Sequence, residues 1–388
     1  MNGIPDKVAA AAARLGKEHS VGFPEAIDVE AGALKRVAPF VAERGFKRPL
    51  VVADERTFRA AGEAVLADLA GAGYREALTL VLPNAQGDVV ADEASIVQVI
   101  LDIQKYAADA IVVAGSGTLH DISRYAAYTT GIPFISVPTA ASVDGFTSKG
   151  APILVRGEKI TVPATGPAAI FADLDVLRQA PAALTAAGFG DMLGKCTSLF
   201  DWKFGSVTAG EPYDEAVADI TEQALRACIE HAEAIGRRTE EGIRVLMNAL
   251  IESGLAMLVF GQSHPASGAE HHLSHYWEME YIRTGKRQLL HGAKVGVACA
   301  EIAGLYLGLR IEDYAKDEAA AQMLRDALRR IPSPDSLRGL LDKAGGPATL
   351  ERLGVDGELL NRSLREAHRI RPNRHTLLRA YNESRESC

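Results

Sequence analysis

The chain has 388 residues, of which 47% are hydrophobic and 24% are charged, and its formal net charge is −8. This length accommodates two domains, and the apolar content excludes a disordered chain. Because the sequence contains no block of lysine or arginine, we expect neither a nucleic acid nor a membrane as partner. The expected partner is a small molecule.

The cysteines and the N-terminus indicate an intracellular setting. Cys196, Cys228, Cys299 and Cys388 lie far apart without paired spacing, so neither a disulfide framework nor a thiolate metal site is expected. Residues 1–17 mix charged residues with alanines, which is typical of an amphipathic helix and not of a signal peptide. We expect no later segment to approach the roughly 20 apolar residues of a membrane span. These features predict a cytoplasmic protein with reduced thiols.

Short β-rich runs alternate with helical segments in the first part of the chain. Continuous apolar strands separated by helices predict a parallel sheet that is covered on both faces. Two further runs predict a small antiparallel appendage, and a third predicts a last strand. The predicted strands are 48–54, 78–83, 110–115, 133–138, 153–155, 159–163 and 170–173, and the helices are 58–72, 94–106 and one from about 118.

From Pro181 onward, helical periodicity replaces the strand pattern. We therefore predict an α/β domain at residues 1–178 and an all-helical domain at residues 179–388. The predicted helices of the second domain are 214–234, 239–260, 271–284, 294–309 and 317–330, with further helices up to the C-terminus.

Two glycines, Gly115 and Gly117, lie between the strand at 110–115 and the following helix. Without side chains in the way, backbone amides here can point at an anion such as a dinucleotide pyrophosphate. A lone Gly-x-Gly is also common in ordinary turns. The ordinary Rossmann fingerprint has an acidic residue about twenty positions downstream, and none lies near position 137. A dinucleotide site here is therefore not an ordinary Rossmann site.

Two other strand ends carry polar residues. Asp54 ends the first predicted strand, where its carboxylate can bind ribose hydroxyls and repel a 2′-phosphate, favouring NAD over NADP. Asp54 can equally cap the helix that follows. Thr139 and Ser142 follow the strand at 133–138, at the edge of the sheet where open α/β folds bind ligands. By composition alone this segment is only a polar loop.

One aspartate and three histidines form the ligand set of an open divalent metal site. His271 and His275 are four positions apart and share a helix face. Asp191 and His291 lie in apolar surroundings, where a bound cation would offset the cost of burying a polar group. A single buried histidine is more often hydrogen-bonded in a core than a ligand, but three within 21 positions favour a metal. His272 points about 100° away from His271, so we place it behind the ligands or on the surface.

Five motifs occur in order across most of the chain and resemble the glycerol-1-phosphate dehydrogenases, particularly their bacterial AraM-like branch. That group belongs to the superfamily of iron-containing alcohol dehydrogenases, glycerol dehydrogenases and dehydroquinate synthases. The resemblance implies a dehydroquinate synthase-like fold, in which the α/β domain binds the dinucleotide and the helical domain binds metal and substrate. The motifs are Gly-Ser-Gly-Thr-Leu-His-Asp121, Val-Pro-Thr-Ala-Ala-Ser-Val-Asp-Gly-Phe-Thr-Ser148, Gly-Phe-Gly-Asp191, Ser-Gly-Ala-Glu-His271-His-Leu-Ser-His275 and Leu-His291-Gly.

The resemblance also implies a role for each residue. Asp191, His271 and His291 match metal ligands, for zinc or nickel, and Asp191 also serves catalysis. Asp144 and His275 match positions beside the substrate. The positions implied for binding the dinucleotide are Asp54, Gly115, Gly117, Thr118, Leu119, His120, Asp121, Thr139, Ala140, Ala141, Ser142 and Ser148.

Two departures from the superfamily pattern affect the expected ligands. Gly115-Ser-Gly-Thr118 replaces Gly-Gly-Gly-Lys and lacks a phosphate-contacting lysine, and Ala293 replaces a glutamate that could support a metal ligand. The substrate phosphate needs a cation, and the sequence does not choose among the available ones, which are Lys149, Lys195, Arg283 and Arg287.

Together these inferences predict a metal-dependent oxidoreductase that interconverts dihydroxyacetone phosphate and sn-glycerol 1-phosphate. The predicted cofactors are NAD(H) or NADP(H), with NAD favoured by Asp54, and one divalent zinc or nickel ion. The substrate is a small phosphorylated three-carbon molecule, His275 orients it or relays a proton, and the resemblance suggests a homodimer. Alternatives are a glycerol dehydrogenase, a dehydroquinate synthase-type lyase, which usually has glutamate in place of Asp191, and a catalytically silent binding module.

Overall fold

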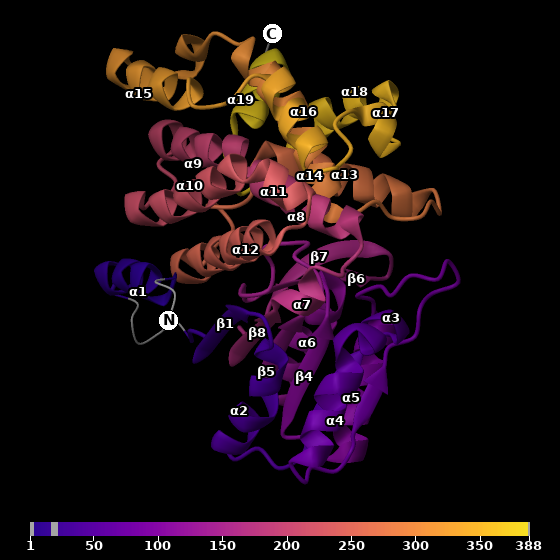
Figure 1. The fold of residues 1–388 in the computed structure, drawn as a ribbon. Helices are drawn as coiled ribbons and strands as arrows, with labels where there is room; N and C mark the ends of the chain where they lie inside the picture. The colour runs from indigo at the N-terminus through magenta and orange to yellow at the C-terminus, as the bar shows by residue number, and fades with distance from the viewer. Residues whose placement is uncertain (1–3, 17–21, 387–388) are drawn as a thin grey trace.

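The computed structural model describes residues 4–16 and 22–386. Its ribbon shows an α/β part with a stack of helices above it (Figure 1). Within the described residues, the main sheet is entirely parallel, in the order β1-β8-β5-β4-β2-β3. The predicted fold class is therefore confirmed. The strands are β1 Ala26–Glu30, β2 Pro49–Ala53, β3 Leu78–Leu80, β4 Ala110–Gly115, β5 Phe134–Pro138 and β8 Ala169–Asp173.

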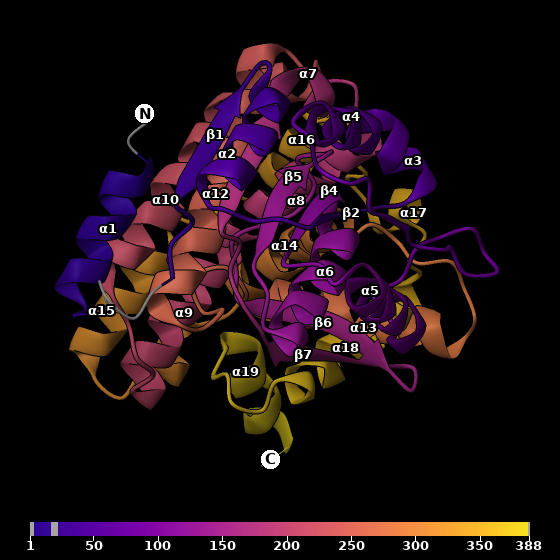
Figure 2. The same ribbon diagram turned by 90° about the horizontal axis from the view of Figure 1, so that it is seen from below.

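Helices cover both faces of this sheet because its central strands are apolar on both sides. α2 (Val37–Glu43) and α4 (Glu63–Gly71) pack on one face, and α5 (Glu93–Tyr106) and α6 (Gly117–Thr130) pack on the other. The view from below shows the strands between these two pairs (Figure 2). The helix predicted at 58–72 is irregular, since α3 (Glu55–Thr57) and a π-helical turn precede α4.

The strand predictions missed β1, and β3 is shorter than predicted. β1 contains Asp28 and Glu30 among its five residues, so no apolar run marks it in the sequence. It becomes a strand because it pairs with β8, where Ala26 lies opposite Ala169. The predicted antiparallel appendage is present as the ribbon of β6 (Gly150–Val155) and β7 (Glu158–Pro163).

The helical part follows β8, and the predicted helices are present with ends shifted by a few residues. The segment predicted at 214–234 is divided at His231, and His291 is the first residue of its helix and does not precede it. The bounds are α7 Leu174–Leu177, α8 Ala182–Leu193, α9 Lys195–Ala209, α10 Glu215–Glu230, α11 Ala232–Gly236, α12 Glu240–Phe260, α13 Ala269–Arg283, α14 His291–Leu307, α15 Glu318–Leu328, α16 Pro334–Lys343, α17 Leu350–Leu353, α18 Gly357–Glu366 and α19 Leu377–Glu386.

One of these helices corrects an expectation about membrane spans. α12 has 21 residues and is apolar enough to cross a membrane by length and composition alone. However, 67% of its apolar window is buried inside the protein, and the helix packs between α1, α8 and α10. A core helix passes the same length and hydropathy test, so α12 is weak evidence for a membrane span.

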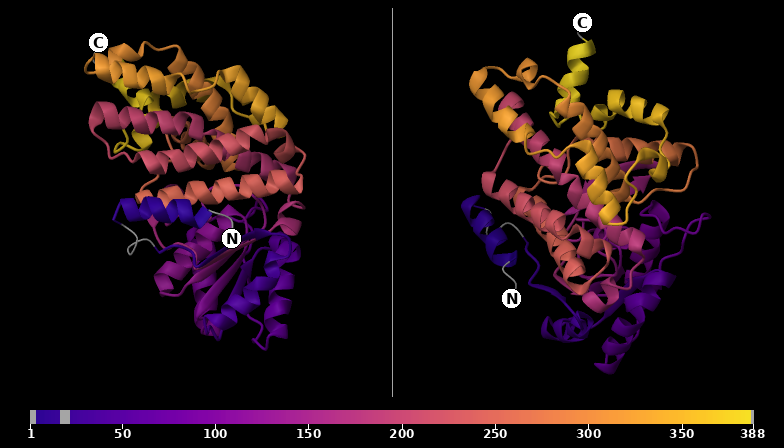
Figure 3. Two further views of the ribbon diagram at one scale, coloured as in Figure 1. Left: turned by 60° about the vertical axis from the view of Figure 1, so that its left-hand side comes forward. Right: turned by 45° about the horizontal axis from the view of Figure 1, so that its top comes forward.

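The N-terminal helix lies against the helical part and not against the sheet. α1 (Ile4–Arg14) runs beside α12 and α10 (Figure 3), and Arg14 pairs with Asp214 at 3.0 Å. The amphipathic helix predicted at residues 1–17 is thus present over its described part, while residues 1–3 and 17 lie outside it. The domain boundary near residue 178 stays a prediction.

Free thiols were expected, and the described cysteines are free. Cys228 and Cys299 are buried, and Cys196 is half-buried. Cys388 lies outside the described residues.

Candidate active site

The dinucleotide prediction concerns the carboxyl ends of β2 and β4, which are neighbours in the sheet. After these two strands the chain turns to opposite sides, because β2 leads to β3 and β4 leads to β5. Open parallel sheets bind ligands in the crevice at such a switch point. Asp54 follows β2, and Ser116 precedes α6 without forming a side-chain cap. Since no side chain caps α6, its first amides remain suited to an anion.

Gly115 and Gly117 have a packing role in addition to the predicted anion site. A Cβ atom at Gly115 would lie 2.6 Å from the Leu119 side chain, and one at Gly117 would lie 2.8 Å from Val143. Both distances are shorter than real Cβ contacts. Glycine is therefore required for close approach of this turn to its neighbours, whether or not a ligand binds.

Both alternatives weighed for Asp54 remain compatible with its surroundings. Its Oδ1 accepts a 2.8 Å hydrogen bond from the backbone of Thr57, whose hydroxyl accepts one from the backbone of Asp54. This reciprocal pair is a capping box, so the helix-cap interpretation is confirmed. A carboxylate has a second oxygen with its own lone pairs, which leaves the ribose-binding prediction standing.

Three predicted cofactor residues on α6 have side chains engaged with protein. His120 is fully buried, with Nδ1 at 2.9 Å from the Ser116 carbonyl oxygen and Nε2 at 2.7 Å from Ser136 Oγ. Burial lowers the pKa of His120 to about 3. Leu119 belongs to the core, and Asp121 pairs with Arg124 at 2.7 Å. His120 and Leu119 can thus contact a cofactor only through their backbone, whereas Thr118 at the helix start is half-buried.

The segment predicted to line the cofactor after β5 is held at the same edge of the sheet. Thr139 donates its N–H to the carbonyl oxygen of Gly115 over 2.9 Å. The fully buried Arg124 donates to carbonyl oxygens of Gly145, Phe146 and Gly150. In this loop Ala140, Ala141 and Ser142 are buried, and Ser148 is half-buried.

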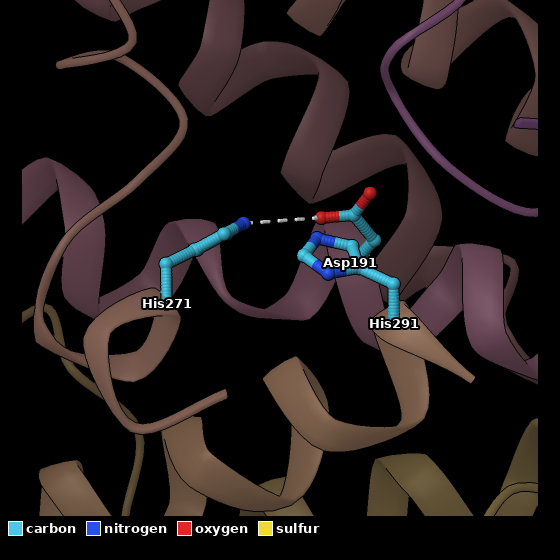
Figure 4. Close-up of side chains that lie close together, drawn as sticks. All are labelled: Asp191, His271 and His291. Carbon is cyan, nitrogen blue, oxygen red and sulfur yellow. Dashed lines mark ion pairs between the residues drawn. The ribbon is translucent and has the colours of Figure 1, made fainter. Parts of the chain in front are cut away.

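Three of the predicted metal ligands meet. One ligand atom each from Asp191, His271 and His291 lies within 4.8 Å of the others, although the residues come from α8, α13 and α14. His271 Nε2 is 3.6 Å from Asp191 Oδ1 (Figure 4). Donors about 2 Å from a tetrahedral ion lie roughly 3.4 Å apart, so this spacing fits a shared cation.

The donor chemistry also fits a cation. His291 Nδ1 is buried and has no hydrogen-bond partner among the described residues, and burial lowers the pKa of His291 to about 3. Its imidazole is therefore neutral, as a metal ligand must be. Burial opposes ionisation of Asp191, but Lys195 and His271 hold the pKa of its carboxyl well below the usual range. Asp191 is thus an anion ready to bind a metal.

Glu270 is a residue of this site that sequence reasoning missed. Its Oε1 lies 2.7 Å from Nδ1 of His271, so the other ring nitrogen faces Asp191. A carboxylate behind a ligating histidine fixes its tautomer and orientation. Burial alone would lower the pKa of His271, but hydrogen bonds to Asp191 and Glu270 raise it. The only signal for Glu270 in the sequence was that it directly precedes His271.

His272 is not a surface residue. It is fully buried, and both of its ring nitrogens lack a partner within the described residues. Burial keeps its pKa well below the usual value, so the ring is neutral. His272 is buried although it points away from His271, because α13 packs against η4 (Ala367–Ile370) and α18 as well as against α14.

Asp144 and Asp191 share one buried cation, Lys195. Lys195 Nζ lies 2.8 Å from Asp144 Oδ2 and 3.0 Å from Asp191 Oδ1. Asp144 also accepts from Ser253 Oγ over 2.8 Å, and its backbone N–H donates to Asp191 Oδ2 over 3.0 Å. The predicted substrate residue is therefore connected directly to the candidate metal ligand.

Glycines allow the elements that carry these ligands to approach closely. An added Cβ at Gly190 would overlap the carbonyl oxygen of Gly292, and one at Gly188 would overlap that of Ala141. α8 can thus touch both the loop after β5 and the start of α14. This contact brings Asp191 to His291 and to the predicted cofactor segment.

His275 lies beside the three ligands. Its ring centroid is 5.9 Å from that of His291, and its Nε2 is 3.3 Å from Arg371 Nη2. Because a guanidinium only donates hydrogen bonds, Nε2 must accept, and the proton of a neutral ring is on Nδ1, 3.8 Å from Glu278. Burial, followed by Lys159 and Arg371, keeps the pKa of His275 well below the usual value.

Three of the four cations considered for the substrate phosphate are already paired with carboxylates. Lys195 is fully buried between Asp144 and Asp191, so its charge is compensated within the protein. Arg283 pairs with Glu280 on the surface. Arg287 likewise pairs with Asp88, and Lys149 is exposed.

Similar proteins identify the family. Residues 28–181 match the family model for iron-containing alcohol dehydrogenase. Two relatives named glycerol-1-phosphate dehydrogenase (NAD(P)+), from Geobacillus stearothermophilus and Geobacillus thermodenitrificans (strain NG80-2), are 46% and 45% identical over 99% of this chain and 99% and 98% of their own length. The solved structure of glycerol dehydrogenase from Schizosaccharomyces pombe matches with a TM-score of 0.69 at 21% identity. The match covers 91% of this chain and 84% of that chain. At this identity the likeness supports the fold alone. The chain belongs to the glycerol-1-phosphate dehydrogenase family of the iron-containing alcohol dehydrogenases.

Proposed function

We propose that this chain is an NAD(P)-dependent enzyme that interconverts dihydroxyacetone phosphate and sn-glycerol 1-phosphate with one divalent cation. The observation that carries this proposal is the meeting of Asp191, His271 and His291 within 4.8 Å of one another. They lie beside Asp144, on the loop that follows β5. The name and 46% identity of a relative over 99% of this chain support the reaction.

A divalent cation bound by these ligands supplies Lewis acidity for a substrate oxygen. Zinc or nickel suits two imidazoles and a carboxylate. The protein's own residues hold this donor set in place. Glu270 orients His271, and Lys195 pairs with both Asp191 and Asp144.

Beside this donor set, His275 serves as the group that orients the substrate or relays a proton. Its low pKa keeps the ring neutral. Arg371 donates to Nε2, which leaves the proton on Nδ1, so the ring can orient a substrate oxygen by donating a hydrogen bond from Nδ1. Asp144, held by Lys195 and Ser253, orients the substrate on the opposite side of Asp191.

The dinucleotide is proposed to bind across the ends of β2 and β4, with its pyrophosphate at the start of α6. Hydride transfer then takes place between its nicotinamide and the substrate. Asp54 favours NAD over NADP because its carboxylate repels a 2′-phosphate. The loop from Thr139 to Ser148 lines the same edge and connects the cofactor to Asp144.

NADH oxidation tests this proposal directly. Chelator-treated protein is assayed with dihydroxyacetone phosphate, dihydroxyacetone or no ketone, before and after zinc or nickel is restored. Turnover that requires both metal and the phosphorylated ketone is expected, and an enantiomer-specific assay then establishes the configuration of the product. Turnover of dihydroxyacetone alone would indicate a glycerol dehydrogenase instead. Absence of NADH oxidation with either ketone would reject both dehydrogenases.

Three further features are part of the proposal. The protein is cytoplasmic, which fractionation of the source cells tests, and it forms a homodimer, which sedimentation equilibrium tests. The α/β domain ends near residue 178. Limited proteolysis is expected to cut between β8 and α8, and fragments with other ends would move this boundary.

A further inference from the structure

The proposed substrate carries a phosphate dianion, and a buried dianion requires a cation or several N–H donors. Of the four cations that the sequence offered, Lys195, Arg283 and Arg287 are paired with carboxylates and Lys149 is exposed. We therefore searched for a positive group near the ligand cluster whose charge is not already balanced by a carboxylate.

Arg371 is such a group. It lies between η4 and α19, on a segment remote in sequence from the other site residues, and it is half-buried. Its Nη1 donates to Ser263 Oγ over 3.2 Å and to Ser267 Oγ over 2.9 Å. Its Nη2 lies 3.3 Å from His275 Nε2. Among residues 4–16 and 22–386, no carboxylate forms an ion pair with it within 4.0 Å.

Arg371 has donors left over for a ligand. Of its five N–H groups, three account for the contacts of Nη1 with the two serines and of Nη2 with His275. The Nε–H and one Nη2–H have no partner among the described residues. A guanidinium with free donors of this kind binds carboxylates and phosphates.

The charges around Arg371 favour an anion. Burial and the nearby Arg374 lower the pKa of Arg371 to about 10 against the opposing effect of Glu270, so it remains a cation at neutral pH. Arg374 lies close to Glu211, which partly balances it at 3.7 Å. Two other cations, Lys159 and Lys294, share the single carboxylate of Glu278, at 2.8 and 3.0 Å, so Glu278 balances only one of their two charges.

The position of Arg371 suits a three-carbon phosphate. His275 lies between Arg371 and the ligand cluster, with its ring centroid 5.9 Å from that of His291. Three covalent bonds separate C2 of dihydroxyacetone phosphate from phosphorus. A substrate whose C2 oxygen lies at Asp191, His271 and His291 can therefore direct its phosphate towards His275 and the guanidinium that His275 contacts.

We infer that Arg371, supported by Ser263 and Ser267, binds the phosphate group of the substrate and selects the phosphorylated ketone over the free one. This inference rests on the proposed function. It also assigns Ser263 and Ser267 a positioning role, since they hold Nη1 and so orient the guanidinium. The same guanidinium sets the tautomer of His275.

Arg371→Gln tests the inference, with Arg371→Lys as the charge-retaining variant and Arg369→Gln as the matched control. Arg369 is two residues away, 62% exposed and paired with Glu386. Calorimetric titration measures binding of sn-glycerol 1-phosphate and of inorganic phosphate, which needs no turnover. Binding of both is expected to weaken about 100-fold in Arg371→Gln and less in Arg371→Lys, and to stay within twofold in Arg369→Gln.

Kinetics separate phosphate binding from a structural role. KM for dihydroxyacetone phosphate is expected to rise about 100-fold in Arg371→Gln, while NADH binding stays within twofold. Equal losses on both ketones, or unchanged binding of the two phosphates, would overturn the inference. If Arg371→Gln does not fold, the same assays on Arg371→Lys and Ser267→Ala test the inference.

Failure of the proposed function is distinguishable from failure of this inference. If wild-type protein does not turn over dihydroxyacetone phosphate, the proposed reaction is wrong, yet phosphate binding that depends on Arg371 still supports an anion site. If wild-type protein catalyses the reaction and Arg371→Gln keeps its KM, the reaction stands and Arg371 is not the phosphate-binding residue.

Discussion

Lys195 and Asp191 form a fully buried ion pair four residues apart, with 3.0 Å between Nζ and Oδ1. The same ammonium reaches Asp144 at 2.8 Å. One positive charge therefore holds two carboxylates at the centre of the proposed site. Removing one partner of a buried pair leaves the other charge uncompensated, which is strongly destabilising.

Lys195→Met is expected to lower the free energy of unfolding of the metal-free protein by about 3–5 kcal/mol. Urea denaturation at pH 7 measures the loss. Lys105→Met, at a 66% exposed lysine on α5, is the control and should change stability by less than about 0.5 kcal/mol. A loss below about 1 kcal/mol in Lys195→Met would show that the pair does not hold the two carboxylates.

Gly190→Ala is expected to separate Asp191 from His291, because the added methyl group would overlap the carbonyl oxygen of Gly292. Overpacking against backbone costs about 1–3 kcal/mol, and zinc affinity should fall with it. Gly339→Ala is the matched control, since this glycine in α16 has open space around it. That control should gain up to about 1 kcal/mol. Unchanged zinc affinity in Gly190→Ala would contradict the proposed ligand geometry.

Glu270→Gln is expected to weaken zinc binding about 10- to 100-fold, because the carboxylate that orients His271 loses its charge. Competition with a chromophoric chelator measures the affinity, and Glu318→Gln, at an 81% exposed position, should leave it unchanged. Equal zinc affinities in wild type and Glu270→Gln would mean that His271 is oriented without this contact.

Asp54→Ser is expected to shift the cofactor preference towards NADPH, by about tenfold in the ratio of kcat/KM values, since the charge that repels a 2′-phosphate is lost. Serine retains the helix cap, so folding should not obscure the result. Asp92→Ser changes an equivalent cap on α5 and should leave the preference as it is. A preference that does not move would leave Asp54 with its capping role alone.

His120 gives the stability of the protein a pH dependence. Burial lowers its pKa to about 3 from 6.5, so below pH 6.5 the unfolded chain takes up a proton that the folded protein does not. The contribution is complete above pH 6.5 and falls on acidification by roughly 1.4 kcal/mol per pH unit. Urea titrations at several pH values between 6.5 and 5 give the free energy of unfolding at each pH. Its slope against pH should be shallower in His120→Gln than in wild type by about that amount. Identical slopes would mean that His120 does not resist protonation.

Local patterns were sufficient for most of the fold. The apolar runs at residues 110–115 and 133–138 became β4 and β5, because such runs are stable only when both faces are covered. The four-residue spacing placed His271 and His275 together on α13. β1 was missed because its alternating acidic residues become a strand only through pairing with β8, about 140 positions away.

The sequence by itself determined the ligand types, the alternation of strands and helices, and the glycines that permit close approach. Only the tertiary structure decided which charges are balanced: Lys195 belongs to Asp144 and Asp191, Glu270 supports His271, and Arg371 comes beside His275 from near the C-terminus. The physical reason is that the cost of a buried charge depends on its neighbours within a few ångströms. These neighbours are brought together by packing between helices distant in sequence, which no local spacing records.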